Sequence, residues 1–163
     1  MNNSNELVVL EPYNPLDKNR IGEQIVSALL AQPIKSLPPE KFIGAGVYAI
    51  YYTSDFPSYS VLATRNKHGN FSAPIYVGKA VPEGTRKGVK NPSENQGTAL
   101  YRRLSEHAKS ISAANNLSLK DFHCRYLAVD DIWIAFTETI LIEKFLPVWN
   151  CLLETLFQNK GAT

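Results

Sequence analysis

The sequence has few cysteines and histidines and no long hydrophobic run. Its two cysteines, Cys124 and Cys151, have neither the pairing of a disulfide scaffold nor the spacing of a zinc site. Its three scattered histidines form no metal-binding cluster. No apolar run approaches the roughly 18 residues that span a bilayer, and the N-terminus lacks the basic start and apolar middle of a signal peptide. We therefore expect two free thiols, no membrane segment and a cytoplasmic protein.

A strong net charge is also missing, since the 163 residues carry only +2 at pH 7. With 44% apolar and 20% charged residues, the composition is that of one ordinary globular domain. The charge is unevenly distributed, because seven basic residues stand against three acidic ones between Lys79 and Lys109. Such a segment is either a solvated loop or a surface for a phosphate backbone. The candidate DNA-binding residues in it are Arg86, Lys87, Lys90 and Arg102.

Two short apolar and aromatic runs predict neighbouring strands, one from Ala45 to Thr53 and one around Tyr76. The first contains Gly46-Val47-Tyr48 and the second Tyr76-Val77-Gly78. Since side chains alternate along a strand, Tyr48 and Tyr76 would stand side by side on a small sheet. Aromatic residues also favour strands for packing alone, so the pair by itself indicates no chemistry.

A helix is predicted to begin at Thr98, with an apolar face made of Leu100, Leu104, Ala108 and Ile111. Arg103 and His107 are four residues apart on the border of this face, so both can reach the tyrosine-bearing sheet. The alternative interpretation is an ordinary surface arginine and a half-buried histidine.

The last predicted helix, from Thr137 to Phe145, contains two glutamates that face opposite ways. Glu138 falls on the stripe of Leu141, Ile142 and Phe145, whereas Glu143 lies about half a turn away on the solvent side. An inward carboxylate is costly unless it is paired, hydrogen-bonded or bound to a cation. Glu138 is therefore either a structural carboxylate or a metal ligand.

The remaining segments complete the expected architecture. Residues 1–40 are predicted to form a polar arm and a short helix, N-capped by Asn19 and ended by Pro33, that pack on the core. Two alternatives stay open for the arm, which are wrapping DNA and meeting another subunit. The segment 54–73 is predicted to be a strand or hairpin insertion around Tyr59–Thr64, with an exposed His68 in a turn near 67–70. A third strand runs from Asp121 to Val129 and places His123 and Cys124 on opposite faces. Together these elements predict an α+β fold with a three-stranded antiparallel sheet flanked by helices.

In this order, the two tyrosine motifs, Arg103, His107, Glu138 and a closing Asn150 resemble the GIY-YIG nuclease superfamily. The likeness is greatest to restriction endonucleases that cut a GC-rich palindrome related to CCGCGG, through Gly44–Tyr52, Tyr76–Pro82 and Val129–Ile134. The resemblance implies a GIY-YIG nuclease domain over 41–150 and an Mg²⁺ ion on Glu138, with Mn²⁺ as a substitute. It implies these catalytic residues: Tyr48, Tyr76, Lys79, Arg103, His107, Glu138 and Asn150.

The function implied by this resemblance is site-specific cleavage of double-stranded DNA by a type II restriction enzyme with one divalent metal. A palindromic site presents two equivalent strands, so a homodimer is expected. Residues 151–163 read as a short tail in place of the longer segment of those enzymes. Two alternatives stay open: an impaired DNA-binding remnant of a truncated restriction enzyme, and a structure-selective repair nuclease.

Overall fold

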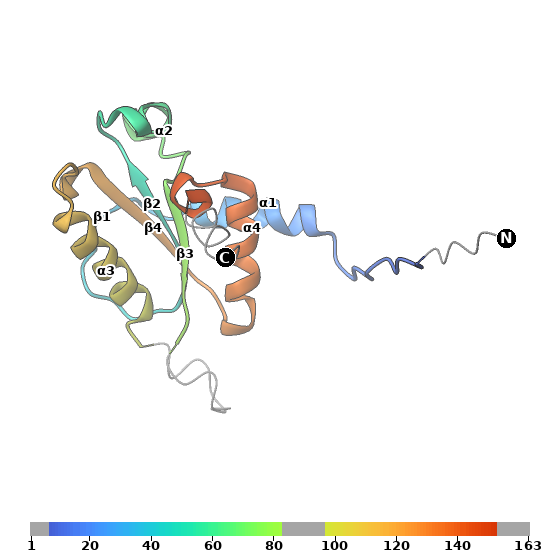
Figure 1. Cartoon of the computed structure of the whole chain (residues 1–163). Coiled ribbons are helices and arrows are strands. Elements are labelled where there is room, and N and C mark those ends of the chain that lie inside the picture. Colours follow the sequence, from blue (N-terminus) through green and yellow to red (C-terminus); the bar gives the residue numbers. More distant parts are fainter. Residues whose placement is uncertain (1–6, 83–96, 153–163) are drawn as a thin grey trace, which may run out of the picture.

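The computed structural model describes residues 7–82 and 97–152, which form a four-stranded sheet between helices (Figure 1). The strand order is β1 (Lys35–Ser36), β4 (Phe122–Ala128), β2 (Gly46–Tyr52) and β3 (Tyr76–Ala80), and all neighbours are antiparallel. The α+β class and the antiparallel sheet are confirmed, but the prediction of three strands is wrong. The added strand β1 has two residues, which is too short for any alternation to show in the sequence.

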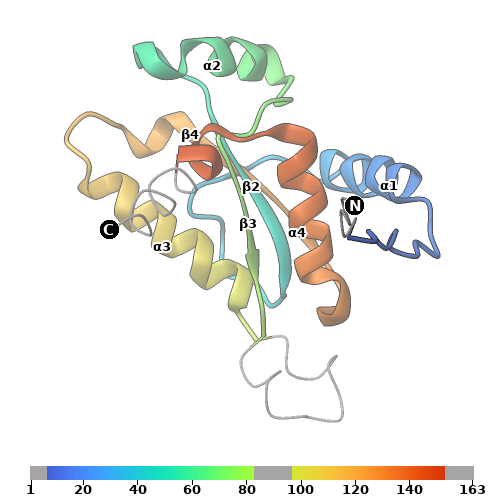
Figure 2. The ribbon, with the colours of Figure 1, turned by 45° about the vertical axis from the view of Figure 1, so that its right-hand side comes forward.

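Helices cover both faces of this sheet. Helix α3 (Ala99–Ala113) lies on one face, and α1 (Lys18–Leu30) and α4 (Asp131–Phe145) lie on the other (Figures 1 and 2). The central strand β2 is therefore buried along all seven residues, while β3 forms an edge. The predicted apolar face of α3 is confirmed, since Leu100, Leu104, Ala108 and Ile111 are all buried. Side chains on the edge strand β3 can therefore meet groups from both helical layers.

The N-terminal region consists of a packed helix and an exposed arm. The helix α1 packs against α4 and β4 and buries Leu29 completely. Its N-cap is Asp17 and not Asn19 as predicted, because Asp17 Oδ1 accepts hydrogen bonds from the backbone N–H groups of Asn19 (3.0 Å) and Arg20 (3.2 Å). The arm was expected to pack on the core together with this helix, whereas residues 7–16 lie exposed.

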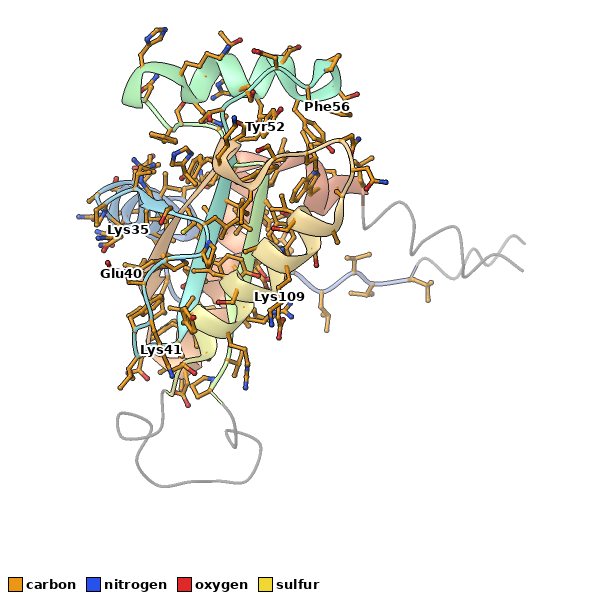
Figure 3. All side chains as sticks on the ribbon, turned by 90° about the vertical axis from the view of Figure 1, so that its left-hand side faces the viewer. Lys35, Glu40, Lys41, Tyr52, Phe56 and Lys109 are labelled. Carbon is orange, nitrogen blue, oxygen red and sulfur yellow. The ribbon has the colours of Figure 1, made fainter. Side chains whose placement is uncertain are left out.

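The prediction of a strand or hairpin insertion at 54–73 is wrong, because the segment is helical. A 3₁₀ turn (Pro57–Tyr59) leads into α2 (Ser60–Asn66) and a second 3₁₀ turn (Lys67–Gly69) that leaves His68 exposed. The buried Asn66 amide donates to the carbonyls of Tyr52 (3.0 Å) and Ala73 (2.8 Å) and accepts from Ala73 N–H (2.9 Å). The Asn66 side chain thus holds the segment after α2 against the end of β2, without backbone hydrogen bonds between strands. Below α2, Tyr52 and Phe56 lie together (Figure 3), and Phe56 N–H donates to Tyr52 Oη at 3.0 Å.

Helix α4 ends at Phe145 as predicted but begins at Asp131, six residues earlier than Thr137. Its first turns are apolar on all sides, since Ile132 and Trp133 are exposed and Ile134 is buried, so they show no stripe in the sequence. In the described part of the chain, no helix is both long and apolar enough to cross a bilayer. Cys124 is a buried free thiol, as predicted, and Cys151 is exposed.

Candidate active site

Two motif glycines let the strands and the tyrosine rings come close together. Tyr48 on β2 lies opposite Gly78 on β3, and a Cβ atom at position 78 would lie 2.5 Å from Tyr48 Oη and 2.8 Å from Tyr76 Cε1. Gly46 has a φ of 152°, and a Cβ there would collide with the backbone carbonyl of Leu127. Both positions therefore require glycine, and the requirement at 78 comes directly from the two tyrosines.

Three rings from three elements meet beside Gly78. The hydroxyl of Tyr48 on β2 lies 2.8 Å from Nε2 of His107 on α3. The Tyr76 ring, on β3, lies 4.8 Å from the His107 ring and 6.0 Å from the Tyr48 ring, centroid to centroid. The structure thus places His107 toward the sheet, as its position on the border of the α3 apolar face predicted.

Burial determines the protonation of this hydrogen-bonded pair. Removal from water raises the pKa of the Tyr48 phenol well above its usual value, and the nearby Tyr76 adds to this while Arg103 opposes it. Removal from water also lowers the pKa of His107 to about 4, with a further lowering by Arg103 and an opposing effect of Glu106. Near neutral pH the phenol is therefore protonated and the imidazole uncharged, so Tyr48 donates its hydrogen to Nε2.

Lys79 and Glu138 form an ion pair between β3 and α4. Lys79 Nζ lies 2.6 Å from Glu138 Oε2, and the exposed side-chain fractions are 42% for Lys79 and 17% for Glu138. Glu143 lies on the solvent side of α4, half exposed and 3.1 Å from Lys18. The two glutamates of α4 therefore point in the directions that the helical periodicity predicted. The inward carboxylate is stabilised by a lysine from the second tyrosine motif.

Arg103 is paired with a carboxylate that the sequence analysis did not single out. Its Nη1 donates to Glu106 Oε2 at 2.6 Å, and both side chains are about half exposed. The spacing of three residues on one helix could have identified this pair, because residues i and i+3 are neighbours on a helical surface. In this structure both predicted cations, Arg103 and Lys79, therefore contact carboxylates.

An open cleft of about 330 Å³ lies at the β3 edge, where the two helical layers meet. It is lined by Tyr76, Lys79, Ala80, Val81, Ala99, Arg102, Arg103 and Glu138. Tyr48 has no exposed surface and is in ring contact with Tyr76. The predicted residues thus form a cleft wall of charged groups and one phenol, with the Tyr48–His107 hydrogen bond next to Tyr76.

Asn150 braces the strand that carries this wall. Its Oδ1 accepts from Val77 N–H at 2.9 Å, and its Nδ2 donates to the Val77 carbonyl at 2.8 Å. The neighbouring Trp149 N–H donates to the carbonyl of Ile75 at 3.0 Å. The edge of β3 thus receives its hydrogen bonds from the segment after α4 in place of another strand, which fixes the register of Tyr76 and Lys79.

Arg102 lines the cleft, whereas the other predicted DNA contacts, Arg86, Lys87 and Lys90, lie outside the described residues. Within 7–82 and 97–152, no group of three His, Cys, Asp or Glu side chains could hold a metal ion. One carboxylate at an open cleft nevertheless fits Mg²⁺, which protein sites often bind through one or two carboxylates, with waters and substrate phosphates as the other ligands.

The family model described as the Eco29kI GIY-YIG domain matches residues 40–161. The matched range includes all seven predicted catalytic residues and most of the segment after Asn150, and it leaves out the arm and α1. A search of curated proteins finds no significant match. Because the family match covers roughly three quarters of the sequence, the chain belongs to the Eco29kI GIY-YIG family and carries a restriction-endonuclease-like nuclease domain.

Proposed function

We propose that this protein is a type II restriction enzyme, a site-specific endonuclease that cuts both strands of duplex DNA using one divalent metal ion. The observation that carries the proposal is the cleft at the β3 edge, where a phenol, a lone carboxylate and cationic groups converge. Cleavage of a phosphodiester needs an oriented water, charge neutralisation on the phosphoryl group and help for the leaving oxygen. The cleft offers a group for each task.

The cationic groups would bind the scissile phosphate. The planar fork of Arg103 suits two non-bridging oxygens, and Lys79 offers a more compact charge. Both contact carboxylates in the DNA-free chain, at 2.6 Å from Glu106 and Glu138 respectively. A phosphate entering the cleft therefore competes with Glu106 for Arg103.

Glu138 would hold the metal ion, with Mg²⁺ as the expected ion and Mn²⁺ as a substitute. When bound, such an ion supplies positive charge to the phosphoryl and leaving oxygens. In the metal-free chain Lys79 occupies this carboxylate, so a cation held by Glu138 would compete with Lys79 for it. Lys79 is 42% exposed, so its side chain has room to turn toward the phosphate.

Tyr76, Tyr48 and His107 would orient the water and move its proton. Tyr76 lines the cleft, so its hydroxyl can position water or phosphate. Tyr48 is the proposed general base: as its oxygen takes a proton from the water, its own phenolic proton would pass to Nε2 of His107, which is uncharged at neutral pH because its pKa is about 4. Tyr48 is fully buried in the DNA-free chain, so this role requires the cleft wall to rearrange when DNA binds.

Recognition would use a homodimer on a palindrome related to CCGCGG, because two-fold symmetry presents one cleft to each strand. Arg102 and the basic residues Arg86, Lys87 and Lys90 would contact the DNA backbone. The excess of basic residues between Lys79 and Lys109 in the sequence supports this assignment.

Plasmid cleavage tests the proposal. The protein is incubated with a plasmid of known sequence at low salt, with Mg²⁺ or with EDTA. Discrete Mg²⁺-dependent fragments that map to one palindrome support the proposal. Binding without cleavage would instead indicate an impaired DNA-binding remnant. Nicking of branched DNA with intact linear duplex would indicate a structure-selective repair nuclease.

A further inference from the structure

Trp149, in the segment after α4, is hydrogen-bonded to two different parts of the chain. Its backbone N–H donates to the carbonyl of Ile75, directly before β3, at 3.0 Å. Its indole N–H donates to Tyr59 Oη, also at 3.0 Å, and Tyr59 is the last residue of the 3₁₀ turn that precedes α2. The segment 54–73 is thereby joined to the edge of the sheet through a hydrogen bond between two partly buried side chains.

An aromatic cluster fixes the position of the Tyr59 hydroxyl. The Tyr59 ring packs on three neighbours, with ring centroids 4.9 Å from Phe56, 5.6 Å from Tyr52 and 6.1 Å from Trp149. Such separations are typical of favourable aromatic pairs. Tyr52 ends β2 and is only 3% exposed, and it lies beside Phe56 in Figure 3. Tyr59 is therefore anchored to the end of the central strand, and its hydroxyl presents a fixed acceptor to the indole.

The turn after α4 needs such an anchor, because its own backbone does not favour it. Leu146 caps α4 with φ 46° and ψ 58°, which is the left-handed region that glycine usually occupies at this place. A leucine in this conformation is strained and persists only where the surrounding structure holds it. The Leu146 side chain is itself 68% exposed, so the contacts that hold the turn must come from neighbours such as Trp149.

Asn150 carries the effect of this anchor to the cleft. It directly follows Trp149 and makes two hydrogen bonds to Val77 in β3, at 2.9 Å and 2.8 Å. Val77 stands next to Tyr76 and two residues before Lys79, and both of these side chains line the cleft. Since β3 is an edge strand, a displaced Asn150 would release its outer side and loosen the side chains that it carries into the cleft.

We propose that Tyr59 and Trp149 are positioning residues for the nuclease reaction. Their hydrogen bond holds Asn150 against β3 and so keeps Tyr76 and Lys79 in place for water and phosphate. Neither Tyr59 nor Trp149 lines the cleft, so both act through Asn150 and not on the substrate. The proposal rests on the proposed function, and it extends the site to residues that lie outside the cleft.

The first test removes one hydroxyl group and leaves its ring in place. Tyr59→Phe deletes the acceptor of the Trp149 indole N–H. The matched control is Tyr51→Phe, which deletes a hydroxyl that lies 3.2 Å from Arg125 Nη1, on a side chain that faces away from Tyr52 across β2. Mg²⁺-dependent cleavage is measured over a series of plasmid concentrations, with thermal melting alongside.

The two variants should separate catalysis from stability. Tyr59→Phe should lower kcat by about 10-fold or more and keep KM near that of wild type, because a misplacement near 1 Å can cost about 100-fold in rate. Tyr51→Phe should melt at a lower temperature than wild type and keep its kcat. A rise in KM at constant kcat for Tyr59→Phe, or an equal fall of kcat in both variants, would overturn the proposal.

The second test asks whether the two side chains act as one unit. Trp149→Phe removes the indole N–H, and the double variant with Tyr59→Phe removes both partners of the hydrogen bond. If this bond positions β3, the kcat of the double variant stays within about threefold of the more damaged single variant. Losses that multiply would show that the two residues act separately, and they would overturn the proposal.

The third measurement examines the edge of β3 without the reaction. The Val77 N–H donates to Asn150 Oδ1, so its hydrogen exchange relative to the amides of β2, followed by NMR, reports whether Asn150 stays in place. This ratio should rise several-fold in Tyr59→Phe and stay at the wild-type value in Tyr51→Phe. An unchanged ratio in Tyr59→Phe would overturn the proposal. A wild-type protein that cuts no DNA, together with the raised ratio in Tyr59→Phe, would refute the proposed nuclease function and leave the positioning of β3 intact.

Discussion

Replacing Gly78 with alanine tests whether the two tyrosines are positioned by contact with the β3 backbone. The added methyl group would lie 2.5 Å from Tyr48 Oη, 2.6 Å from Tyr48 Cζ and 2.8 Å from Tyr76 Cε1. All three distances are shorter than van der Waals contact, so at least one ring must move. Tyr48 cannot move far without losing its 2.8 Å hydrogen bond to His107. We therefore expect one substitution to reduce both stability and chemistry.

The magnitude follows from the cost of overpacking a dense core. Extra methyl groups in such places cost about 1–3 kcal/mol, which corresponds to a fall in melting temperature of roughly 2–12 °C for a domain of this size. A misplacement near 1 Å in a catalytic site can cost about 100-fold in rate, so cleavage should fall by about that factor. Thermal melting and Mg²⁺-dependent plasmid cleavage measure the two effects.

The matched control is Gly44→Ala. This glycine is also buried, but its added methyl group would lie 3.7 Å from the nearest side chains, which is ordinary contact. Its melting temperature should stay unchanged or rise slightly, because alanine restricts the unfolded chain. If Gly78→Ala melts and cuts like Gly44→Ala, the tyrosines are not packed on Gly78 and the cleft geometry described above is wrong.

Three further predictions concern protonation and charge. The pKa of His107 falls from 6.5 to about 4 on folding, so the unfolded chain binds more protons between these values. The free energy of unfolding should therefore fall as the pH drops from about 6.5 to 4, by up to about 1.4 kcal/mol per unit, and His107→Gln should flatten this curve in pH-dependent denaturation. Changing Lys87 and Lys90 to glutamine should weaken binding to all duplexes alike and lower the slope of log affinity against log salt by about 2. An unchanged slope would exclude both lysines as phosphate contacts. Glu106→Gln should release Arg103 and tighten duplex binding at low salt, and unchanged binding would show that this ion pair does not compete with phosphate.

Local periodicity allowed the sequence to predict much of this fold. The buried face of α3 was predicted because Leu100, Leu104 and Ile111 recur at helical spacing, and the same rule oriented His107 toward the sheet. Strand β2 was predicted because its residues form a continuous apolar and aromatic run, which is typical of a strand buried on both faces. These elements follow from patterns within a single segment.

The errors occurred where distant contacts determine the structure. Val61 and Thr64 favoured a strand, yet α2 forms because the Asn66 side chain bonds the chain on both sides of it. The start of α4 was missed because its first turns carry apolar residues on every side, exposed Trp133 among them. The Lys79–Glu138 ion pair joins two elements that lie far apart in the sequence, so no local pattern could predict it.

The most direct test of the central claim compares Glu138→Gln with Glu143→Gln in Mg²⁺-dependent plasmid cleavage. Glu138 is 17% exposed beside the cleft, whereas Glu143 is 52% exposed on the opposite side of α4 in a surface ion pair that contributes about 0–1 kcal/mol. Gel-shift binding and thermal melting serve as controls for folding. We predict that Glu138→Gln still folds and binds DNA but loses cleavage by several orders of magnitude, because a bound cation stabilises the transition state by several kcal/mol, while Glu143→Gln cuts normally. Near-normal cleavage by Glu138→Gln, or loss of cleavage by Glu143→Gln alone, would contradict the placement of the active site in this cleft.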